Sequence, residues 1–199
     1  PDNFSGWKFF QIPFSSFNRK DIGNGAPNDG FNKTEIHGYG IGGFGSAPML
    51  NQKYYIDNLG LIPRTTVVDN FEYTAGLPSG VDGDGVPVGF ITWSYNNVSS
   101  SITLTVPGEQ PAGAPAGNQV MQLNLNLGSG KWGGFSHNFE NAGLDQWVSQ
   151  DWSTYEGICF WLRGNNTGGV IFVDIMDNRN PGSTKDDAER WSVDVPDNF

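Results

Sequence analysis

The chain is built from short apolar or alternating runs separated by Gly, Pro, Asn and Asp, and no stretch keeps the 3.6-residue apolar period of a long helix. The clearest run is Gln119–Leu127, where an apolar residue stands at every second position from Met121 onward, as in a strand with one buried face. Runs of this kind predict nine strands. They are Trp7–Pro13, Glu35–Ile41, Lys53–Ile62, Val67–Phe71, Ser101–Val106, Gln119–Leu127, Tyr155–Arg163, Gly169–Met176 and Arg190–Val195.

Three other segments interrupt this pattern. Pro107–Gly117 and Asp177–Lys185 are expected to be loops, because they are rich in Pro, Gly and polar residues and proline cannot donate to a strand ladder. Asn141–Trp152 is expected to hold a helical turn. Many short strands with frequent turn signals indicate an all-β fold, a β-sandwich of two antiparallel sheets.

The composition agrees with one globular β domain and excludes some classes of binding partner. The chain has 199 residues, a length that fits a single large sandwich, and 14% of them are aromatic and only 16% charged. The net charge of −10 would repel nucleic acids and anionic membrane surfaces, so neither is expected as a partner. No apolar run approaches the roughly 18–20 residues that span a membrane, so membrane insertion is not expected either.

Catalytic motifs are missing from the sequence. Its two histidines, His37 and His137, lie in no metal or nucleophile motif, and the patterns HExxH and GxSxG are absent. Pairs of carboxylates could in principle hydrolyse glycosides, but nothing in the sequence singles out such a pair. The protein is therefore expected not to be an enzyme.

The same four residues, Pro-Asp-Asn-Phe, stand at positions 1–4 and 196–199, so that the second copy begins 195 residues after the first. A unit of 195 residues cut from a tandem array would explain this repetition, and so would an engineered circular permutation. Continued past residue 199, Arg190–Val195 leads through a turn-rich segment into Trp7–Pro13, which is the pattern of a hairpin. The first strand is therefore expected to pair with the last, in the same chain or in a neighbouring copy.

Three motifs carry a resemblance to a known family: GWKFFQIPFSSF at 6–17, YYIDNLGLI at 54–62 and DNFE at 69–72. With these motifs, the chain resembles the family 11 carbohydrate-binding modules and the related domains of complex I intermediate-associated protein 30. Residues 67–199 resemble the N-terminal part of such a module and residues 1–62 its C-terminal part. The resemblance implies one jelly-roll β-sandwich over residues 1–199, no catalysis, and binding of β-glucan chains along a concave sheet face.

The resemblance also implies residues of a polysaccharide site. Arg19 lies where the family has an arginine-rich ligand stretch, and Asp187, four residues before Trp191, matches a ligand-contacting acid. Tyr39 and Trp132 are further candidates for stacking against sugar rings. The chain departs from the family where a tyrosine would follow the arginine stretch, and Lys131 replaces the aromatic residue that precedes the Trp-Gly pair.

The family further implies a structural calcium ion. Asp69 and Glu72 lie on one end strand of the family module and Asp57 on the other, and carboxylate oxygens of this kind are the ligands that calcium prefers. Four Asn-X-Ser/Thr sequons could carry glycans on a secreted protein. They are Asn3, Asn32, Asn97 and Asn165.

Two functions remain open from the sequence. The first is a carbohydrate-binding module, one repeat of a larger protein that is secreted or lies on the cell surface. The second is a structural repeat of an extracellular glycosylated fibre or adhesin, in which neighbouring copies exchange strands and so cover their open sheet edges. Both place the chain outside the cell.

Overall fold

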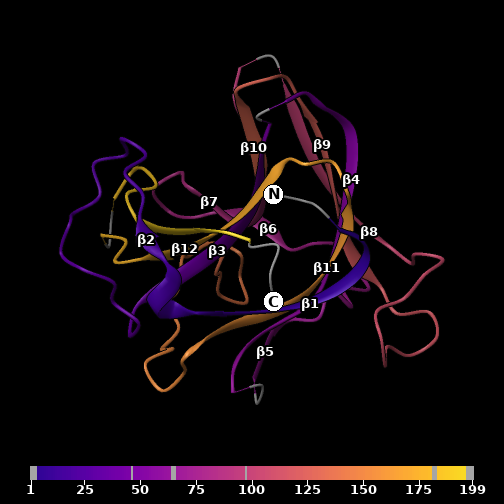
Figure 1. The fold of residues 1–199 in the computed structure, drawn as a ribbon. Helices are drawn as coiled ribbons and strands as arrows, with labels where there is room; N and C mark the ends of the chain where they lie inside the picture. Colours follow the sequence, from indigo (N-terminus) through magenta and orange to yellow (C-terminus); the bar gives the residue numbers. More distant parts are fainter. Residues whose placement is uncertain (1–3, 46, 64–65, 97, 181–182, 196–199) are drawn as a thin grey trace.

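The computed structural model describes residues 4–45, 47–63, 66–96, 98–180 and 183–195. Their regular structure consists of two antiparallel sheets and one short 3-10 helix, η1 (Phe14–Ser16), and loops connect these elements (Figure 1). In the six-stranded sheet the order is β1 (Ser5–Pro13), β11 (Gly157–Asn165), β4 (Met49–Ile62), β9 (Val120–Leu127) and β8 (Ser99–Thr105). The sixth strand, β5 (Thr66–Asp69), pairs with the C-terminal end of β4. In the seven-stranded sheet it is β2 (Asn18–Arg19), β13 (Glu189–Asp194), β12 (Val170–Asp177), β3 (Ile36–Gly45), β10 (Lys131–Asn138), β7 (Pro87–Ser94) and β6 (Ser79–Val81). The predicted all-β sandwich is confirmed.

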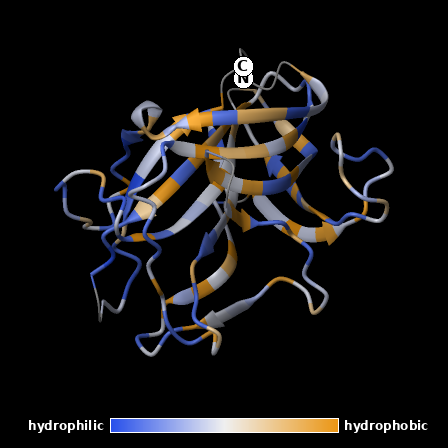
Figure 2. Cartoon of the chain, turned by 90° about the horizontal axis from the view of Figure 1, so that it is seen from below, coloured by the Kyte–Doolittle hydropathy of each residue, from blue (hydrophilic) through white to orange (hydrophobic). Residues whose placement is uncertain are grey.

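The core lies between the two sheets, where each strand points every second side chain inward. Leu123 and Leu125 of β9 meet Ile41 of β3 and Phe135 of β10 in one buried cluster. Each such side chain contributes about 1.5–3 kcal/mol when it is fully buried. Figure 2 shows the same division, with hydrophobic segments concentrated on the strands and hydrophilic ones on the loops.

Each of the nine predicted strands overlaps an observed strand, although the ends differ by a few residues. The prediction missed β2 and β6, which have only two and three residues, β10, which contains two adjacent glycines among polar residues, and β7, which begins with Pro87 and contains Gly89. The helical turn predicted in Asn141–Trp152 is wrong, since this segment consists of turns and isolated bridges such as Glu140↔Trp147. The predicted loop Pro107–Gly117 is confirmed. Within the described residues, no helix is long and apolar enough to cross a membrane.

The predicted pairing of the first strand with the last is wrong within the chain. The two strands lie in different sheets: β1 pairs along its whole length with β11, whereas β13 pairs with β12 and β2. The physical reason is that Phe10 and Ile12 of β1 enter the core from the six-stranded sheet, while Val193 of β13 enters it from the other. The repeated residues 1–3 and 196–199 lie outside the described residues, so the tandem array and the permutation stay predictions.

A buried hydrogen-bond network joins the two sheets. Tyr39 of β3 and His137 of β10 stand opposite each other in the seven-stranded sheet. From β5 of the six-stranded sheet, the Asp69 Oδ2 accepts hydrogen bonds from the Tyr39 hydroxyl and the His137 Nδ1, both at 2.7 Å. The Tyr73 hydroxyl donates to the other oxygen of Asp69, and His137 Nε2 lies 2.9 Å from Glu140 Oε2. Both ring nitrogens of His137 thus face carboxylates.

This arrangement keeps His137 charged at neutral pH. Burial by itself lowers the pKa of an imidazole, but the hydrogen bonds to Asp69 and Glu140 and the charges of both carboxylates outweigh it and raise the pKa of His137 from 6.5 to about 9. Because the folded pKa lies above the unfolded one, the stabilisation is complete below about pH 6.5 and is lost as the pH rises through 9. The difference corresponds to roughly 3 kcal/mol.

We therefore expect the free energy of unfolding to fall between pH 6.5 and pH 9, and this fall to be much smaller in His137→Asn. Urea unfolding at several pH values measures both. The matched control is His37→Asn, because burial lowers the pKa of His37 and its proton is lost before this pH range. An unchanged pH dependence in His137→Asn would contradict the assignment.

Candidate functional site

The outer face of the seven-stranded sheet carries a group of aromatic side chains. Because Ile41, Phe135 and Val173 point into the core, their neighbours along β3, β10 and β12 point outward. Phe44 and Trp132 stand opposite each other on this outer side and are 38% and 41% exposed. Exposed aromatic rings on one face of a sheet indicate a binding surface.

Two glycines shape the middle of this face. Trp93, Gly134, Gly42 and Phe172 occupy one row across β7, β10, β3 and β12. The glycines leave the space above the two central strands open, so the rings of Trp93 and Phe172 lean toward each other and stack with centroids 5.9 Å apart and planes 20° apart. A methyl group at Gly42 or Gly134 would overlap with the Trp93 ring.

The contacts continue on both sides of this stack. The Lys20 Nζ lies 3.9 Å from the Phe172 ring centre at one end. On the other side, Trp93 contacts Trp132 at 5.8 Å, Trp132 contacts Tyr95 at 5.8 Å, and the Lys131 Nζ lies 4.0 Å from the Tyr95 ring centre. We call Phe172, Trp93, Trp132 and Tyr95 the aromatic row. It is a continuous line of rings with a lysine at each end.

Polar groups border the aromatic row. The Lys20 Nζ forms an ion pair with Asp174 at 3.3 Å, and Asp174 shares a row of the sheet with Gly40 and Ser136. Rings that stack on the apolar faces of sugars, with charged and hydroxyl groups beside them for the sugar hydroxyls, form the chemistry of a carbohydrate site.

Comparison with protein-family models matches residues 65–199 to the carbohydrate binding domain (family 11). This match covers more than half of the chain. The chain belongs to this family. No curated protein and no solved structure matched the chain. The predicted resemblance to family 11 is thus confirmed, while the likeness to complex I intermediate-associated protein 30 stays a prediction.

The matched segment does not form the sandwich of this family 11 domain without the preceding residues. In the six-stranded sheet β11 lies between β1 and β4, and in the other sheet β3 lies between β12 and β10. The strands β1, β3 and β4 all precede residue 65. The two segments therefore alternate within both sheets and share one core.

Of the predicted sugar-stacking residues, Trp132 lies in the aromatic row and Tyr39 does not. Tyr39 is fully buried and donates its hydroxyl proton to Asp69. The prediction of Tyr39 as a ligand-binding residue is therefore wrong, because its ring faces the core between Phe135 and His137.

Arg19 and Asp187 belong to a different part of the domain. The Arg19 Nε donates to Glu189 Oε1 at 2.6 Å and its Nη2 to the Pro27 carbonyl at 3.0 Å, so the guanidinium neutralises a fully buried carboxylate. Asp187 is buried and accepts a hydrogen bond from the Asn180 amide at 3.2 Å. It lines an open depression of about 480 Å³ together with Asp29 and other residues.

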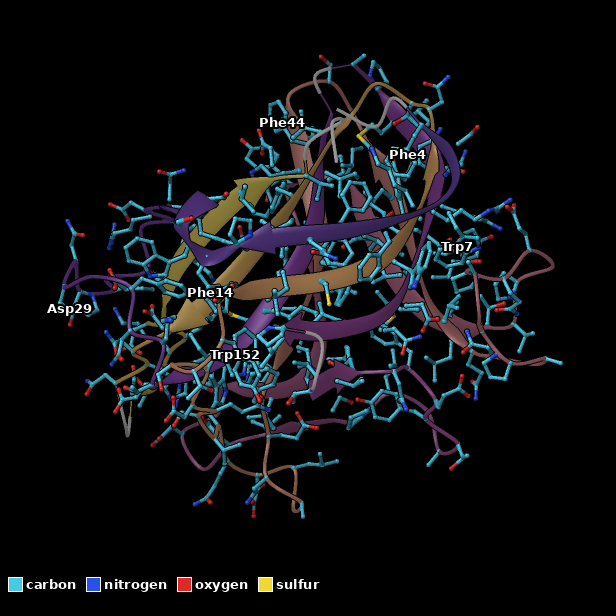
Figure 3. All side chains as sticks on the ribbon, turned by 60° about the horizontal axis from the view of Figure 1, so that its bottom comes forward. Phe4, Trp7, Phe14, Asp29, Phe44 and Trp152 are labelled. Carbon is cyan, nitrogen blue, oxygen red and sulfur yellow. The ribbon has the colours of Figure 1, made fainter. Side chains whose placement is uncertain are left out.

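This depression and Trp132 lie at opposite ends of the sheet. The pairing of β3 with β12 runs from Phe44↔Val170 at one end to Ile36↔Asp177 at the other. Eight residues of strand span about 25 Å. Figure 3 likewise shows Phe44 and Asp29 far apart on the molecule. The structure therefore does not bring Arg19 and Asp187 together with Trp132.

Sequence reasoning missed most of the aromatic row. Of its four rings only Trp132 is among the residues expected from the sequence, whereas Trp93, Tyr95 and Phe172 are not. Alternation in Pro87–Ser94 would have placed Ile91 and Trp93 on one face, had this segment been recognised as a strand.

The three predicted calcium ligands do not form one cluster. Asp69 is almost fully buried and hydrogen-bonded to Tyr39, Tyr73 and His137, so the charged His137 already compensates its negative charge. The prediction of Asp69 as a metal ligand is therefore not supported. Among the described residues, no group of three or more His, Cys, Asp or Glu side chains is arranged to hold a metal ion.

Asp57 and Glu72 remain near each other. Asp57 is fully buried and accepts hydrogen bonds from the side-chain amides of Asn58 and Asn118 at 3.0 and 3.1 Å. The Glu72 Oε1 accepts a hydrogen bond from the Gln119 amide at 2.7 Å. Burial raises the pKa of Asp57, and the nearby Glu72 charge raises it further. These two carboxylates thus repel each other unless a cation lies near.

Two of the four sequons can be placed. Asn32 is partly buried, and its side-chain nitrogen donates to Asn178 at 2.7 Å. Asn165 is exposed at the end of β11. Asn3 and Asn97 lie outside the described residues. Glycosylation stays a prediction at all four.

The packing of Trp93 over Gly42 predicts the effect of a small substitution. Gly42→Ala is expected to lower the free energy of unfolding by about 1–3 kcal/mol, because the added methyl group would push against the rings of Trp93 and Phe172. Urea unfolding measures the loss. Gly108→Ala is the control, since no atom lies within 4 Å of the added methyl group there. Equal stability of the two variants would show that the stack is loose.

Proposed function

We propose that this domain is a non-catalytic module that binds a polysaccharide through the outer face of the seven-stranded sheet. The observation that carries the proposal is the aromatic row, in which Trp132 and Tyr95 are 41% and 40% exposed. Family membership supports carbohydrate as the ligand class. A β-glucan is the polymer that the resemblance to family 11 implies.

The aromatic row offers more than one exposed ring to a ligand. Its four rings follow one another at 5.8–5.9 Å and lie on β12, on β7 and the residue after it, and on β10. Because neighbouring strands lie about 4.8 Å apart, these rings extend across four strands of the sheet, including β3. Phe172 is only 6% exposed, so it supports Trp93 from below, and a sugar chain would stack on Trp132 and Tyr95, with the partly exposed Trp93 beside them.

The surroundings of the two histidines support a binding role without catalysis. His137 is 6% exposed and held between Asp69 and Glu140. The His37 Nδ1 lies 3.0 Å from the Glu35 carbonyl oxygen. Among the described residues, neither imidazole contacts a ring of the aromatic row. We place the module in a larger protein that works outside the cell, as the family implies.

Trp132→Ala is expected to weaken polysaccharide binding about tenfold or more, which corresponds to about 1.4 kcal/mol. Titration against a panel of β-glucans and other plant and microbial polysaccharides, by calorimetry or affinity electrophoresis, measures the change. Trp7→Ala is the matched control, because Trp7 lies on β1 of the other sheet.

A folded domain that binds no polysaccharide of the panel would overturn the proposed function. Equal loss of affinity in Trp7→Ala would instead move the site to the six-stranded sheet. Melting curves of both variants exclude unfolding as the cause.

A structural calcium ion at Asp57 and Glu72 is part of the same proposal. The donor set fits, because a fully buried carboxylate with a second carboxylate nearby has only neutral amides as hydrogen-bond partners among the described residues. The side-chain oxygen of Gln110 and the carbonyl of Gln119 lie around the same Asn118 amide and would add neutral oxygen ligands. A bound cation would neutralise both carboxylates and tie β4 to the segment after β5.

Calcium is therefore expected to raise the free energy of unfolding, by about 2.7 kcal/mol at a free concentration 100-fold above its Kd. Thermal unfolding with calcium or with a chelator measures this, and Asp57→Asn should abolish the difference. Asp84→Asn, in an exposed turn, is the control. An identical calcium effect in Asp57→Asn would assign the ion to another place.

A further inference from the structure

The Lys131 end of the aromatic row opens into a depression of about 540 Å³. Its lining consists of Leu50, Tyr95, Asn96, Val98, Asn126, Gly128 and Lys131. Among the described residues of this lining, Lys131 alone is charged, although acidic residues outnumber basic ones by 21 to 11 in the whole chain. The depression therefore differs in charge from the protein that surrounds it.

The two lysines at the ends of the aromatic row have different partners. Lys20 forms an ion pair with Asp174 at 3.3 Å. Lys131 has no carboxylate within ion-pair distance among the described residues, and its Nζ lies 4.0 Å from the Tyr95 ring centre. A cation over an aromatic ring keeps its charge and several of its donors directed outward. Lys131 is thus held in place and can bind an anion.

The depression also offers amide groups and a stacking surface. Asn96 and Asn126 supply side-chain amides in the lining. Tyr95 is 40% exposed and contacts Trp132 edge to face at 5.8 Å. A sugar ring on Tyr95 or Trp132 would therefore carry its substituents toward Lys131 and the two amides.

We propose that this depression binds an anionic sugar residue of a polysaccharide, with the acidic group on the Lys131 ammonium. A carboxylate, as in a uronic acid, and a sulfate ester share the chemistry that the lysine and the amides recognise. The inference rests on the proposed function and deepens it, since it names an acidic polymer as the ligand class. The net charge of −10 repels polyanions at long range, so such binding must depend on this local site.

Lys131→Gln in the full chain tests the proposal. The probes are a polyuronate, a sulfated glucan and a neutral β-glucan, measured by calorimetry at the same ionic strength. Lys131→Gln is expected to weaken binding of the polyuronate about fivefold, as the loss of one partly exposed ion pair predicts, and to weaken binding of the neutral glucan by a clearly smaller factor. Lys131→Arg should retain binding. Lys53→Gln is the matched control, because Lys53 is exposed on β4 of the other sheet and carries the same charge.

Each outcome decides between the hypotheses. Lys131-dependent binding of the polyuronate assigns a carboxylate, and the same behaviour of the sulfated glucan alone assigns a sulfate; both support an anion site. Binding of the neutral glucan alone overturns this inference and leaves the proposed function standing. An equal loss in Lys53→Gln shows unspecific charge attraction and also overturns it. If none of the probes and no polysaccharide of the wider panel binds, both proposals fail.

Discussion

The hydrogen bonds around Asp69 link the two sheets of this domain, and the position of the outer face of the seven-stranded sheet depends on them. Asp69 belongs to the six-stranded sheet, whereas Tyr39 and His137, which donate to it, lie on β3 and β10 in the middle of the other sheet. A buried carboxylate is stable only when it is paired and hydrogen-bonded, so the three side chains fix the spacing and register of the sheets at this point. The same two strands carry Gly42, Gly134 and Trp132 on their opposite side. The charged core and the outer face are thus two sides of one pair of strands.

Because successive side chains of β3 and β10 point to opposite sides, one side of each strand fills the core and the other forms the outer face. On the inner side, large residues such as Ile41 and Phe135 fill the core. On the outer side, glycines leave room for rings that come from β7 and β12, three strands apart in the sheet order. The stack of Trp93 on Phe172 therefore needs small residues on the strands between them, not only aromatic residues on the strands that supply the rings. A larger residue at either glycine would disturb the face by displacing the Trp93 ring.

The outer face has two chemically different ends. At one end, Lys131 has no ion-pair partner in the part of the chain that the structure describes, and it stands among amides and exposed rings. Near Asp187, acidic residues and Arg179 line the other depression, and Asp187 itself is buried there. At that end Arg19 neutralises the buried Glu189, which is a structural task.

The sequence by itself determined the all-β class, nine of the strands, the family and one residue of the aromatic row, Trp132. These features depend on alternation and local motifs, which are visible along the chain. It could not reveal that Tyr39 is buried while Trp132 is exposed, because both depend on which face of a strand meets the other sheet. Nor could it separate Asp69, which three donors surround in the core, from Asp57, which lies beside Glu72. The tertiary structure alone decided these points, since strands distant in the sequence supply the partners that give each side chain its role.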